Sequence, residues 1–381
     1  MKFLNDIDFS GKSVLLRLDL NTPIHEGRVS NNERILRSLK TINFLNERCN
    51  KIIIISHLGR PKENNQIQEE FSLRPVAKEL TDLLGKEVVF ADKVEELKEE
   101  RITLLENIRF LEGEKANSND LSDKLALLSD VFVFDAFATA HRAHASTTGV
   151  INYSKDACAG FLVQEELESL DRAFSSPRRP LLAVIGGSKV STKLGLLTSL
   201  VEKVDHLILG GGIANTCLLS QGRNIGKSLA EETMTNEALA LAENDKVLIP
   251  DEFVVSDENQ DLAIRHINEI REEDSIFDVS ENFFQKNISL FQNAGTIVWN
   301  GPLGLIEDNR FLGGTKTVAK LISRSQAFSV IGGGDTILGA NKANVLKEMG
   351  YVSTAGGAFL EYLEGKELPA ISALKNKTLE S

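Results

Sequence analysis

The chain has 381 residues, more than one hydrophobic core usually supports, and its 42% apolar content is enough to fill two cores. Its net charge of −12 argues against broad affinity for nucleic acids or anionic membranes, because an acidic surface repels phosphate groups. No apolar stretch reaches the roughly 18 residues of a membrane span, and the first ten residues contain no long apolar segment, so we expect a cytoplasmic protein.

Short apolar strands alternate with helical patterns over the first 160 residues, which is typical of an α/β domain with a mainly parallel sheet. Strands are expected at residues 14–20, 51–56, 88–91, 102–106 and 131–137. The apolar spacing over 33–48 predicts a helix, and so does that over 72–85, where Gly85 is expected to end it.

The sequence pattern changes near residue 160, and a second α/β segment follows. Residues 161–176 read as one amphipathic helix, which the PRRP sequence at 177–180 ends. Beyond it, apolar runs at 181–185, 207–209, 297–299 and 329–331 predict further strands.

The fold class predicted from these patterns is α/β, with two Rossmann-like lobes of mainly parallel sheet, joined by a helix and separated by a cleft. The expected divisions are a first lobe at 1–160, a connecting helix and hinge at 161–180, a second lobe at 181–364 and a tail at 365–381. We expect the tail to add a short helix that packs back on the first lobe.

The residues that follow the apolar runs differ between the two lobes. In the second lobe they are glycine clusters, in IGGSK, LGGGI, WNGPLG and IGGGDT, whereas the first lobe places arginine and histidine there, at Arg17, His57, Arg60, Arg109 and Arg142. Arginine recognises a compact anion by forked hydrogen bonds, and glycine lets backbone N–H groups approach phosphate closely. The contrast predicts two different anionic ligands, one on each lobe.

Two glycine-rich motifs of the second lobe carry charged side chains. In GGSKVSTK, a helix beginning near Ser188 would place Lys189 and Lys193 on one face, where both could meet the same polyphosphate. The alternative is an ordinary turn with solvated lysines. In IGGGDT, Asp335 is the best candidate for a Mg²⁺ ligand, although an aspartate that caps the next helix is also consistent with the pattern.

Two other motifs of the second lobe are less specific. WNGPLGLIE supplies Asn300 and Glu307, both suited to ribose hydroxyls, or it is a plain loop. STAGGAFLEYLEG resembles a helix start whose N–H groups around Gly356 and Gly357 point at an anion, or it is a simple chain reversal.

Three other patterns are set aside. QGRNIGKS has only three residues between Gly222 and Gly226, too few for a phosphate-binding loop. His141 and His144 have a metal-like spacing without a carboxylate or cysteine partner, and the three cysteines are scattered. A GxGxxG fingerprint does not follow the first strands, which disfavours a dehydrogenase.

Taken together, the motifs resemble those of phosphoglycerate kinase over about residues 8–375, in the order in which that family has them. They are DLNTP, SHLGRP, LLENIRF, DAFATAHRAHAST, GGSKVSTK, GGGIANT, WNGPLGLIE, GGGDT and GGAFLE. Residues 256–290 match nothing we identify, and Ala138 and Ala355 stand where the family usually has glycine.

The resemblance implies reversible phosphoryl transfer between 1,3-bisphosphoglycerate and MgADP, giving 3-phosphoglycerate and MgATP in glycolysis, by a hinge-bending monomer with Mg²⁺ as cofactor. The residues that it implies for phosphoglycerate binding are Asp19, Asn21, Arg34, His57, Leu58, Gly59, Arg60, Arg109 and Arg142. Those for the nucleotide are Lys193, Gly210, Gly211, Asn300, Glu307, Gly333, Gly334, Asp335 and Thr336, with Asp335 as the metal ligand. The expected catalytic groups are Arg34, Lys189, Gly356 and Gly357.

The acceptor of this reaction is a carboxylate, which is ionised at neutral pH, so a general base is not required and His57 is expected to bind substrate. Three other functions stay open on the residues alone. They are a kinase or synthetase of another small carboxylate, a non-catalytic nucleotide-binding protein, and an NAD-dependent dehydrogenase.

Overall fold

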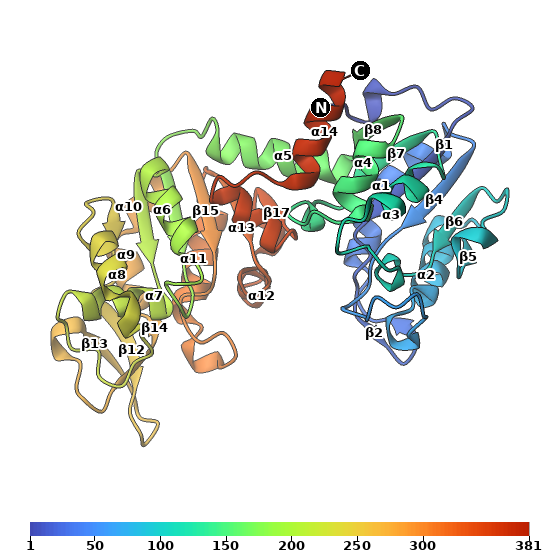
Figure 1. The fold of residues 1–381 in the computed structure, drawn as a ribbon. Helices are drawn as coiled ribbons and strands as arrows, with labels where there is room; N and C mark the ends of the chain where they lie inside the picture. The colour runs from blue at the N-terminus through green and yellow to red at the C-terminus, as the bar shows by residue number, and fades with distance from the viewer. Residues whose placement is uncertain (381) are drawn as a thin grey trace. The chain divides into compact units, whose positions relative to one another are not determined.

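The computed structural model describes residues 1–380, which form two compact units (Figure 1). Unit 1 contains Met1–Leu167 together with the chain from Glu367 onward, and unit 2 contains Glu168–Lys366. Each unit is built on a six-stranded parallel sheet flanked by helices, which confirms the predicted α/β class.

The sheet of unit 1 consists of strands that are buried on both faces, as expected for a parallel sheet covered by helices on each side. Its strands lie in the order β5 (Val89–Ala91), β6 (Ile102–Leu105), β4 (Lys51–Ile55), β1 (Ser13–Leu18), β7 (Val131–Asp135) and β8 (Asp156–Ala159). Of these, β8 was not predicted.

The first two helices of unit 1 begin and end close to the positions predicted at 33–48 and 72–85, whereas the other two were not predicted. In chain order they are α1 (Glu33–Asn46), α2 (Arg74–Leu84), α3 (Asn119–Ala126) and α4 (Val150–Tyr153). Gly85 ends α2 in the left-handed conformation, at φ 61°, which a glycine adopts without a steric penalty. Short 3₁₀ turns η4 (Ile108–Phe110) and η5 (Phe137–Thr139) and a π-helical turn η6 (Ala145–Gly149) follow the later strands, and β2 (Ile24–His25) pairs with β3 (Arg28–Val29).

The chain passes from unit 1 to unit 2 within one helix, and after unit 2 it adds another helix to unit 1. Helix α5 (Phe161–Phe174) crosses the boundary between the units, and the backbone N–H groups of Leu162 and Val163 in its first turn donate to Oδ1 of Asp135 at 2.8 and 3.1 Å. Helix α14 (Pro369–Glu380) packs on α4 and β8 of unit 1, where the N–H of Ala370 donates to the carbonyl of Ala140 at 3.1 Å (Figure 1).

The sheet of unit 2 has the same construction. Its order is β11 (Val247–Leu248), β10 (His206–Leu209), β9 (Leu181–Ile185), β15 (Thr296–Asn300), β16 (Phe328–Gly332) and β17 (Tyr351–Ser353). The helices are α6 (Leu194–Lys203), α7 (Gly211–Ser220), α8 (Thr235–Ala242), α9 (Glu281–Lys286), α10 (Ile288–Asn293), α11 (Gly313–Arg324), α12 (Gly334–Lys342) and α13 (Gly357–Leu363).

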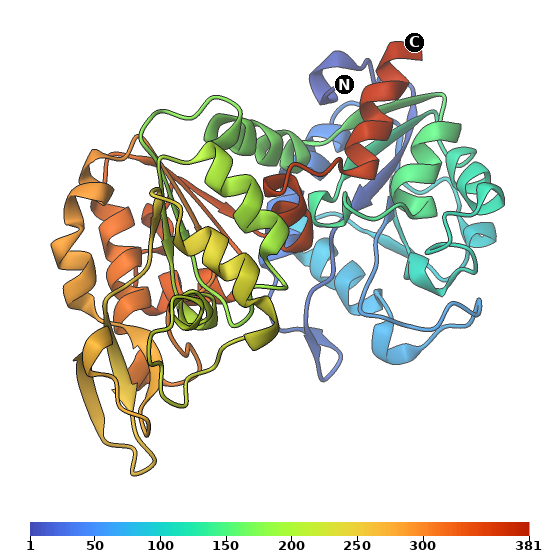
Figure 2. The same cartoon turned by 60° about the vertical axis from the view of Figure 1, so that its left-hand side comes forward.

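Part of the stretch without a recognisable motif, residues 256–290, belongs to a small antiparallel sheet at one end of unit 2 (Figure 2). Its strands lie in the order β13 (Leu262–His266), β12 (Glu252–Ser256) and β14 (Ser275–Val279). Phe253 and Val279 of this sheet join the same hydrophobic core as Trp299 of β15. The small sheet is therefore part of the unit and not a separate domain.

In both parallel sheets the strand order reverses at one point, and crevices for ligands form where the loops diverge at such a point. The reversal lies between β1 and β7 in unit 1 and between β9 and β15 in unit 2. Among residues 1–380, none of the helices has the length and apolar character to cross a membrane.

Candidate functional sites

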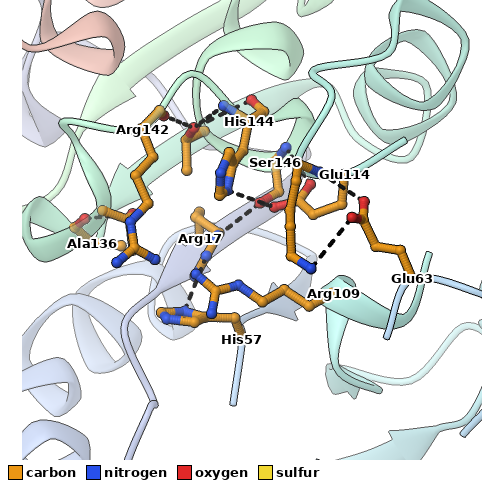
Figure 3. Close-up of polar contacts among 12 residues, drawn as sticks. Arg17, His57, Glu63, Arg109, Glu114, Ala136, Arg142, His144 and Ser146 are labelled. Carbon is orange, nitrogen blue, oxygen red and sulfur yellow. Dashed lines mark hydrogen bonds and ion pairs between the residues drawn. The ribbon is translucent and has the colours of Figure 1, made fainter. Parts of the chain in front are cut away.

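Four adjacent strands of unit 1 supply a cluster of three arginines and one histidine at their carboxyl ends. Arg17 lies in β1, His57 follows β4, Arg109 lies in the turn after β6, and Arg142 follows β7. Since β6, β4, β1 and β7 are neighbours in the sheet, their ends bring these side chains together (Figure 3). The expected convergence of the arginine motifs is thus found at the reversal point.

Polar contacts between the loops order the rim of this cluster. Oδ1 of Asn21 accepts from the backbone N–H of Gly59 at 2.9 Å, and Arg109 donates to the carbonyl of Gly59. Arg34 in α1 pairs with Asp19, which follows β1. These loops therefore support one another before a ligand is bound.

The other residues predicted for this site differ in exposure. Leu58 is buried, and its carbonyl accepts from Nδ2 of Asn107 at 2.7 Å. Arg60 is exposed, whereas Arg142 is half-buried and donates from Nε to Nε2 of His141 at 3.3 Å.

The charges of the cluster perturb its titratable groups. Burial and the nearby charges of Arg17, Arg109 and Arg142 hold the pKa of His57 well below its usual value, so its imidazole is uncharged at neutral pH. Burial and the other arginines lower the pKa of Arg109 to about 10. Several cations gathered around an uncharged histidine form a site that an anion would stabilise.

Three polar residues behind the cluster were missed by sequence reasoning. Arg17 is buried and donates from Nε to Oγ of Ser146, and Ser146 in turn donates to Glu114, while Nδ1 of His144 lies 3.7 Å from Oε1 of Glu114 (Figure 3). Arg17 was predicted among the anion-binding arginines, whereas its side chain is engaged with protein groups. Glu114 and Ser146 carry no signal in a single sequence, because only the fold brings them to Arg17. His144 was noted for its spacing with His141, but its carboxylate neighbour, Glu114, is supplied only by the fold.

The reversal point of unit 2 contains a cavity of about 720 Å³. Its lining includes Gly187, Lys193, Gly211, Asn300, Glu307, Gly333, Gly334, Asp335 and Thr336, so most of the predicted nucleotide residues surround one space. Apolar side chains such as Leu229, Phe253 and Leu303 line the same cavity. A polar, glycine-lined region beside an apolar one suits a ligand that carries both phosphates and a planar base.

Lys193 and Asn300 order this cavity from within. The Lys193 ammonium donates to Oδ1 of Asn300 at 2.7 Å and to the carbonyl of Gly186 at 2.5 Å. Nδ2 of Asn300 donates to the carbonyl of Gly332 at 2.6 Å, and the N–H of Gly301 donates to Oγ1 of Thr336 at 2.7 Å. Both polar ends of the Asn300 side chain are thus engaged within the protein, and burial lowers the pKa of Lys193 to about 8.

The prediction that Lys189 and Lys193 share a helix face was wrong. Helix α6 begins at Leu194, and the preceding residues form a loop in which Gly187 has φ 155° and only residues 191–193 make a turn. The lysine side chains consequently differ: Lys189 is exposed and outside the cavity lining, whereas Lys193 reaches back to Gly186.

Two helix starts carry predicted glycines. Gly210 precedes α7, and a Cβ at this position would lie 2.4 Å from the side chain of Leu303. Gly356, at φ 56°, precedes α13, and the next residue, Gly357, opens that helix. The neighbouring Ala355 is buried and has a backbone outside the left-handed region, so its methyl group is accommodated without strain.

The carboxylates that line the cavity suit a metal that is bound together with phosphates. Asp335 lies in the first turn of α12, and its charge acts on Lys193. Among residues 1–380 there is no group of three or more His, Cys, Asp or Glu side chains that could hold a metal ion by themselves. Mg²⁺ commonly takes one or two protein carboxylates and completes its shell with phosphate oxygens and water, so Asp335 and the glycine loop fit it.

The model of the phosphoglycerate kinase family matches residues 4–366 of this sequence. The chain belongs to the phosphoglycerate kinase family. The phosphoglycerate kinase of Coxiella burnetii (strain RSA 493 / Nine Mile phase I) is 45% identical over 388 residues, covering 99% of each chain. That of Francisella tularensis subsp. novicida (strain U112) is 44% identical over 388 residues, covering 99% of this chain and 98% of the relative.

Solved phosphoglycerate kinases have the same fold. The structure of the Coxiella burnetii enzyme superposes with a TM-score of 0.94 over 99% of each chain, at 45% identity. That of the Pyrococcus horikoshii OT3 enzyme superposes with a TM-score of 0.84 over the whole of both chains, at 30% identity. As a phosphoglycerate kinase, the protein is a phosphotransferase that acts between 1,3-bisphosphoglycerate and ADP, giving 3-phosphoglycerate and ATP in glycolysis. The dehydrogenase and the non-catalytic alternative are thereby set aside.

Proposed function

We propose that the two sites divide the substrates, with the phosphoglycerate on the cationic cluster of unit 1 and the nucleotide in the cavity of unit 2. The observation that carries this assignment is the charge pattern around His57, where arginines from three strand ends and α1 act on one uncharged imidazole. Such a cluster suits a small acid with a carboxylate and a phosphate, which arginine recognises by paired hydrogen bonds. Asp19, Asn21 and the loop at residues 57–60 would position its hydroxyl and phosphate groups.

The cavity of unit 2 would hold ATP or ADP by its glycine loops and Lys193. Backbone N–H groups at Gly333, Gly334 and the first turn of α12 favour phosphate oxygens, because they lie at a helix start. Asp335 would hold Mg²⁺, which supplies positive charge to the phosphate oxygens when it is bound. Glu307 is exposed at the cavity edge and would reach the ribose.

The chemistry asks the protein for charge neutralisation and alignment more than for proton transfer. The acceptor carboxylate of 3-phosphoglycerate is ionised at neutral pH, which leaves no proton to be removed. Arg34, Lys189 and the N–H groups of Gly356 and Gly357 would stabilise the negative charge on the transferring phosphoryl group. Because these groups belong to different units, we propose a hinge movement around residues 161–180 that excludes water from the reactive acyl phosphate, in a cytoplasmic monomer.

Separate titrations of the two ligands test the division. Isothermal titration calorimetry of the whole protein with 3-phosphoglycerate, and separately with MgATP, would be recorded for Arg109→Met and for Asp335→Asn. We expect Arg109→Met to weaken only 3-phosphoglycerate binding and Asp335→Asn to weaken only MgATP binding. A loss of MgATP affinity in Arg109→Met, with 3-phosphoglycerate binding unchanged, would contradict the assignment.

A further inference from the structure

Arg17 is the least exposed arginine of the cluster, at 1%, although Arg109 is also buried, at 5%. The Arg17 guanidinium is engaged with the protein on every side. Nε donates to Oγ of Ser146 at 3.1 Å, Nη1 donates to the carbonyl of Leu18, and Nη2 lies 3.3 Å from Nδ1 of His57 (Figure 3). Arg17 is therefore placed to act on a neighbouring side chain and not directly on a ligand.

The contact between Arg17 and His57 dictates which ring nitrogen of His57 carries the proton. A guanidinium offers only donors, so Nδ1 of His57 must accept. A neutral imidazole with an accepting Nδ1 has its proton on Nε2. A proton on Nδ1 would instead place two N–H groups against each other.

The other charged groups around His57 favour the same state. Arg109 of η4, Arg142 after η5 and Arg34 of α1 act on the ring together with Arg17, and all four are cations. An added proton on the ring is thus opposed by all four of these cations. The ring has Nε2–H left as the donor that it can offer to an anion.

A buried carboxylate holds Arg17 in this orientation through Ser146. Oγ of Ser146 accepts from Arg17 and donates to Oε1 of Glu114 at 2.6 Å, while the backbone N–H of Ser146 donates to Oε2 at 2.9 Å. Glu114 has no exposed surface, and its charge acts on Arg17. Burial raises the pKa of Glu114, whereas the charge of Arg17 and the two donors of Ser146 act in the opposite direction. These contacts favour the ionised carboxylate, which compensates the buried guanidinium.

We propose that Arg17 is a positioning residue that fixes His57 as the neutral tautomer with its proton on Nε2, and that Glu114, acting through Ser146, holds Arg17 in place. The functional meaning of this inference rests on the proposed binding of phosphoglycerate by His57. His57 then presents one donor of constant charge and direction to the substrate anion. The arginines around it supply the positive charge.

Nitrogen NMR of the wild-type protein labelled with ¹⁵N-histidine tests the tautomer without any ligand. The signals of His57 are assigned by their loss in His57→Gln. Between about pH 6 and pH 8, where a free histidine titrates, we expect Nε2 to remain protonated and Nδ1 to remain unprotonated. A proton on Nδ1, or a doubly protonated ring at pH 7, would overturn the proposal.

Two substitutions at Arg17 separate the positioning role from a structural one. Arg17→Lys keeps a side chain that only donates, and the His57 spectrum should stay as in the wild type. Arg17→Gln offers an acceptor as well as a donor, so we expect mixed tautomers and an increase of about tenfold in KM for 3-phosphoglycerate, as for one hydrogen bond to a charged ligand. The matched control is Arg28→Gln, at an exposed position in β3. This variant should change neither the His57 spectrum nor the KM for 3-phosphoglycerate.

A folded Arg17→Gln protein with only the Nε2–H tautomer would refute the role of Arg17. Ser146→Ala tests the connection to Glu114 with a smaller change, and it also decides the case if Arg17→Gln does not fold. Removal of its hydroxyl should produce a second set of His57 signals, and an unchanged spectrum would refute the connection. If instead the tautomer is as expected but His57→Gln leaves KM unchanged, the proposed substrate contact fails while the tautomer assignment stands.

Discussion

The ammonium of Lys193 lies 2.7 Å from Oδ1 of Asn300, and this contact joins the loop after β9 to the end of β15. Asn300 also donates to the carbonyl of Gly332, at the end of β16. Two side chains thus tie together three adjacent strands of the unit 2 sheet at their carboxyl ends, where the cavity lies.

Asn300→Ala should therefore lower both stability and nucleotide affinity. The substitution leaves the half-buried Lys193 without one acceptor and the carbonyl of Gly332 without its donor, which typically costs about 2 kcal/mol in the free energy of unfolding. Urea denaturation and titration with MgATP measure the two effects. Asn236→Ala, at an exposed position in α8, is the control, and equal stability of the two variants would contradict the prediction.

The affinity for MgATP should fall as the pH rises above 8. Burial lowers the pKa of Lys193 to about 8, and bound phosphates favour the protonated amine. Nucleotide binding at about pH 8.5 should consequently take up protons, which calorimetry in buffers of different ionisation enthalpy detects. Lys193→Arg stays charged and should show no uptake. If the wild type takes up no protons when it binds nucleotide, Lys193 does not face the phosphates.

The lowered pKa of Lys193 also makes the free energy of unfolding depend on pH in a defined direction. The pKa of Lys193 is lower in the folded protein, about 8, than the ordinary value of 10.5. Between these values the unfolded chain binds more protons, so the contribution of Lys193 to the free energy of unfolding rises with pH in this window. Comparison of wild type and Lys193→Arg between pH 8 and pH 10.5 isolates this contribution.

Gly186→Ala should destabilise unit 2 because the backbone of a neighbouring loop leaves no room for a methyl group. A Cβ at Gly186 would lie 1.8 Å from the carbonyl oxygen of Pro302. Overpacking of this kind costs roughly 1–3 kcal/mol, and a lower Tm would report it. Gly334→Ala is the matched control, because nothing lies within 4 Å of its added carbon; a similar Tm for both variants would argue against the close approach.

Arg34→Ala and Lys189→Ala should fold normally but lose turnover. Both side chains are at least partly exposed, so little packing is lost. Removal of a preorganised donor to the transferring group lowers kcat by a factor on the order of 10². A coupled assay with 3-phosphoglycerate and MgATP measures kcat, with the exposed Arg28→Ala and Lys320→Ala as controls. Near wild-type kcat in either site variant removes that residue from the mechanism.

Leu374→Ala in α14 should destabilise unit 1. Leu374 is fully buried, and truncation of a buried leucine costs about 2–5 kcal/mol because a cavity remains. Leu379, in the same helix, is 85% exposed, and its replacement by alanine should change the free energy of unfolding little. Equal effects in denaturant unfolding would mean that α14 does not pack on unit 1 in solution.

The sequence allowed the parallel strands to be located because burial on both faces gives short continuous apolar runs, as in β1, β4 and β9. Strand β8 (Asp156–Ala159) has only four residues, two of them alanine, and this is too short and too weakly apolar to stand out. The exposed positions of β13 likewise interrupt its pattern.

The candidate sites were predictable to the extent that their residues follow strands. His57, Arg109 and Asn300 could be found in this way, since parallel strands end at one edge of a sheet. Glu114 could not, because a carboxylate in a loop is usually solvated and its contact with Ser146 depends on long-range folding. The start of α6 was misplaced because Gly187 and the residues after it hold the chain in a loop up to Lys193.

The position of α14 in unit 1 has a consequence for synthesis on the ribosome. Unit 2 is one continuous segment and has all its residues once Lys366 has emerged, whereas the surface of α4 and β8 stays uncovered until α14 follows. The unit that begins the chain is thus the last to be completed. Leu374 and Ile371 of α14 are buried in the folded protein, so until α14 emerges the surface on which it packs is open to chaperones or to aggregation.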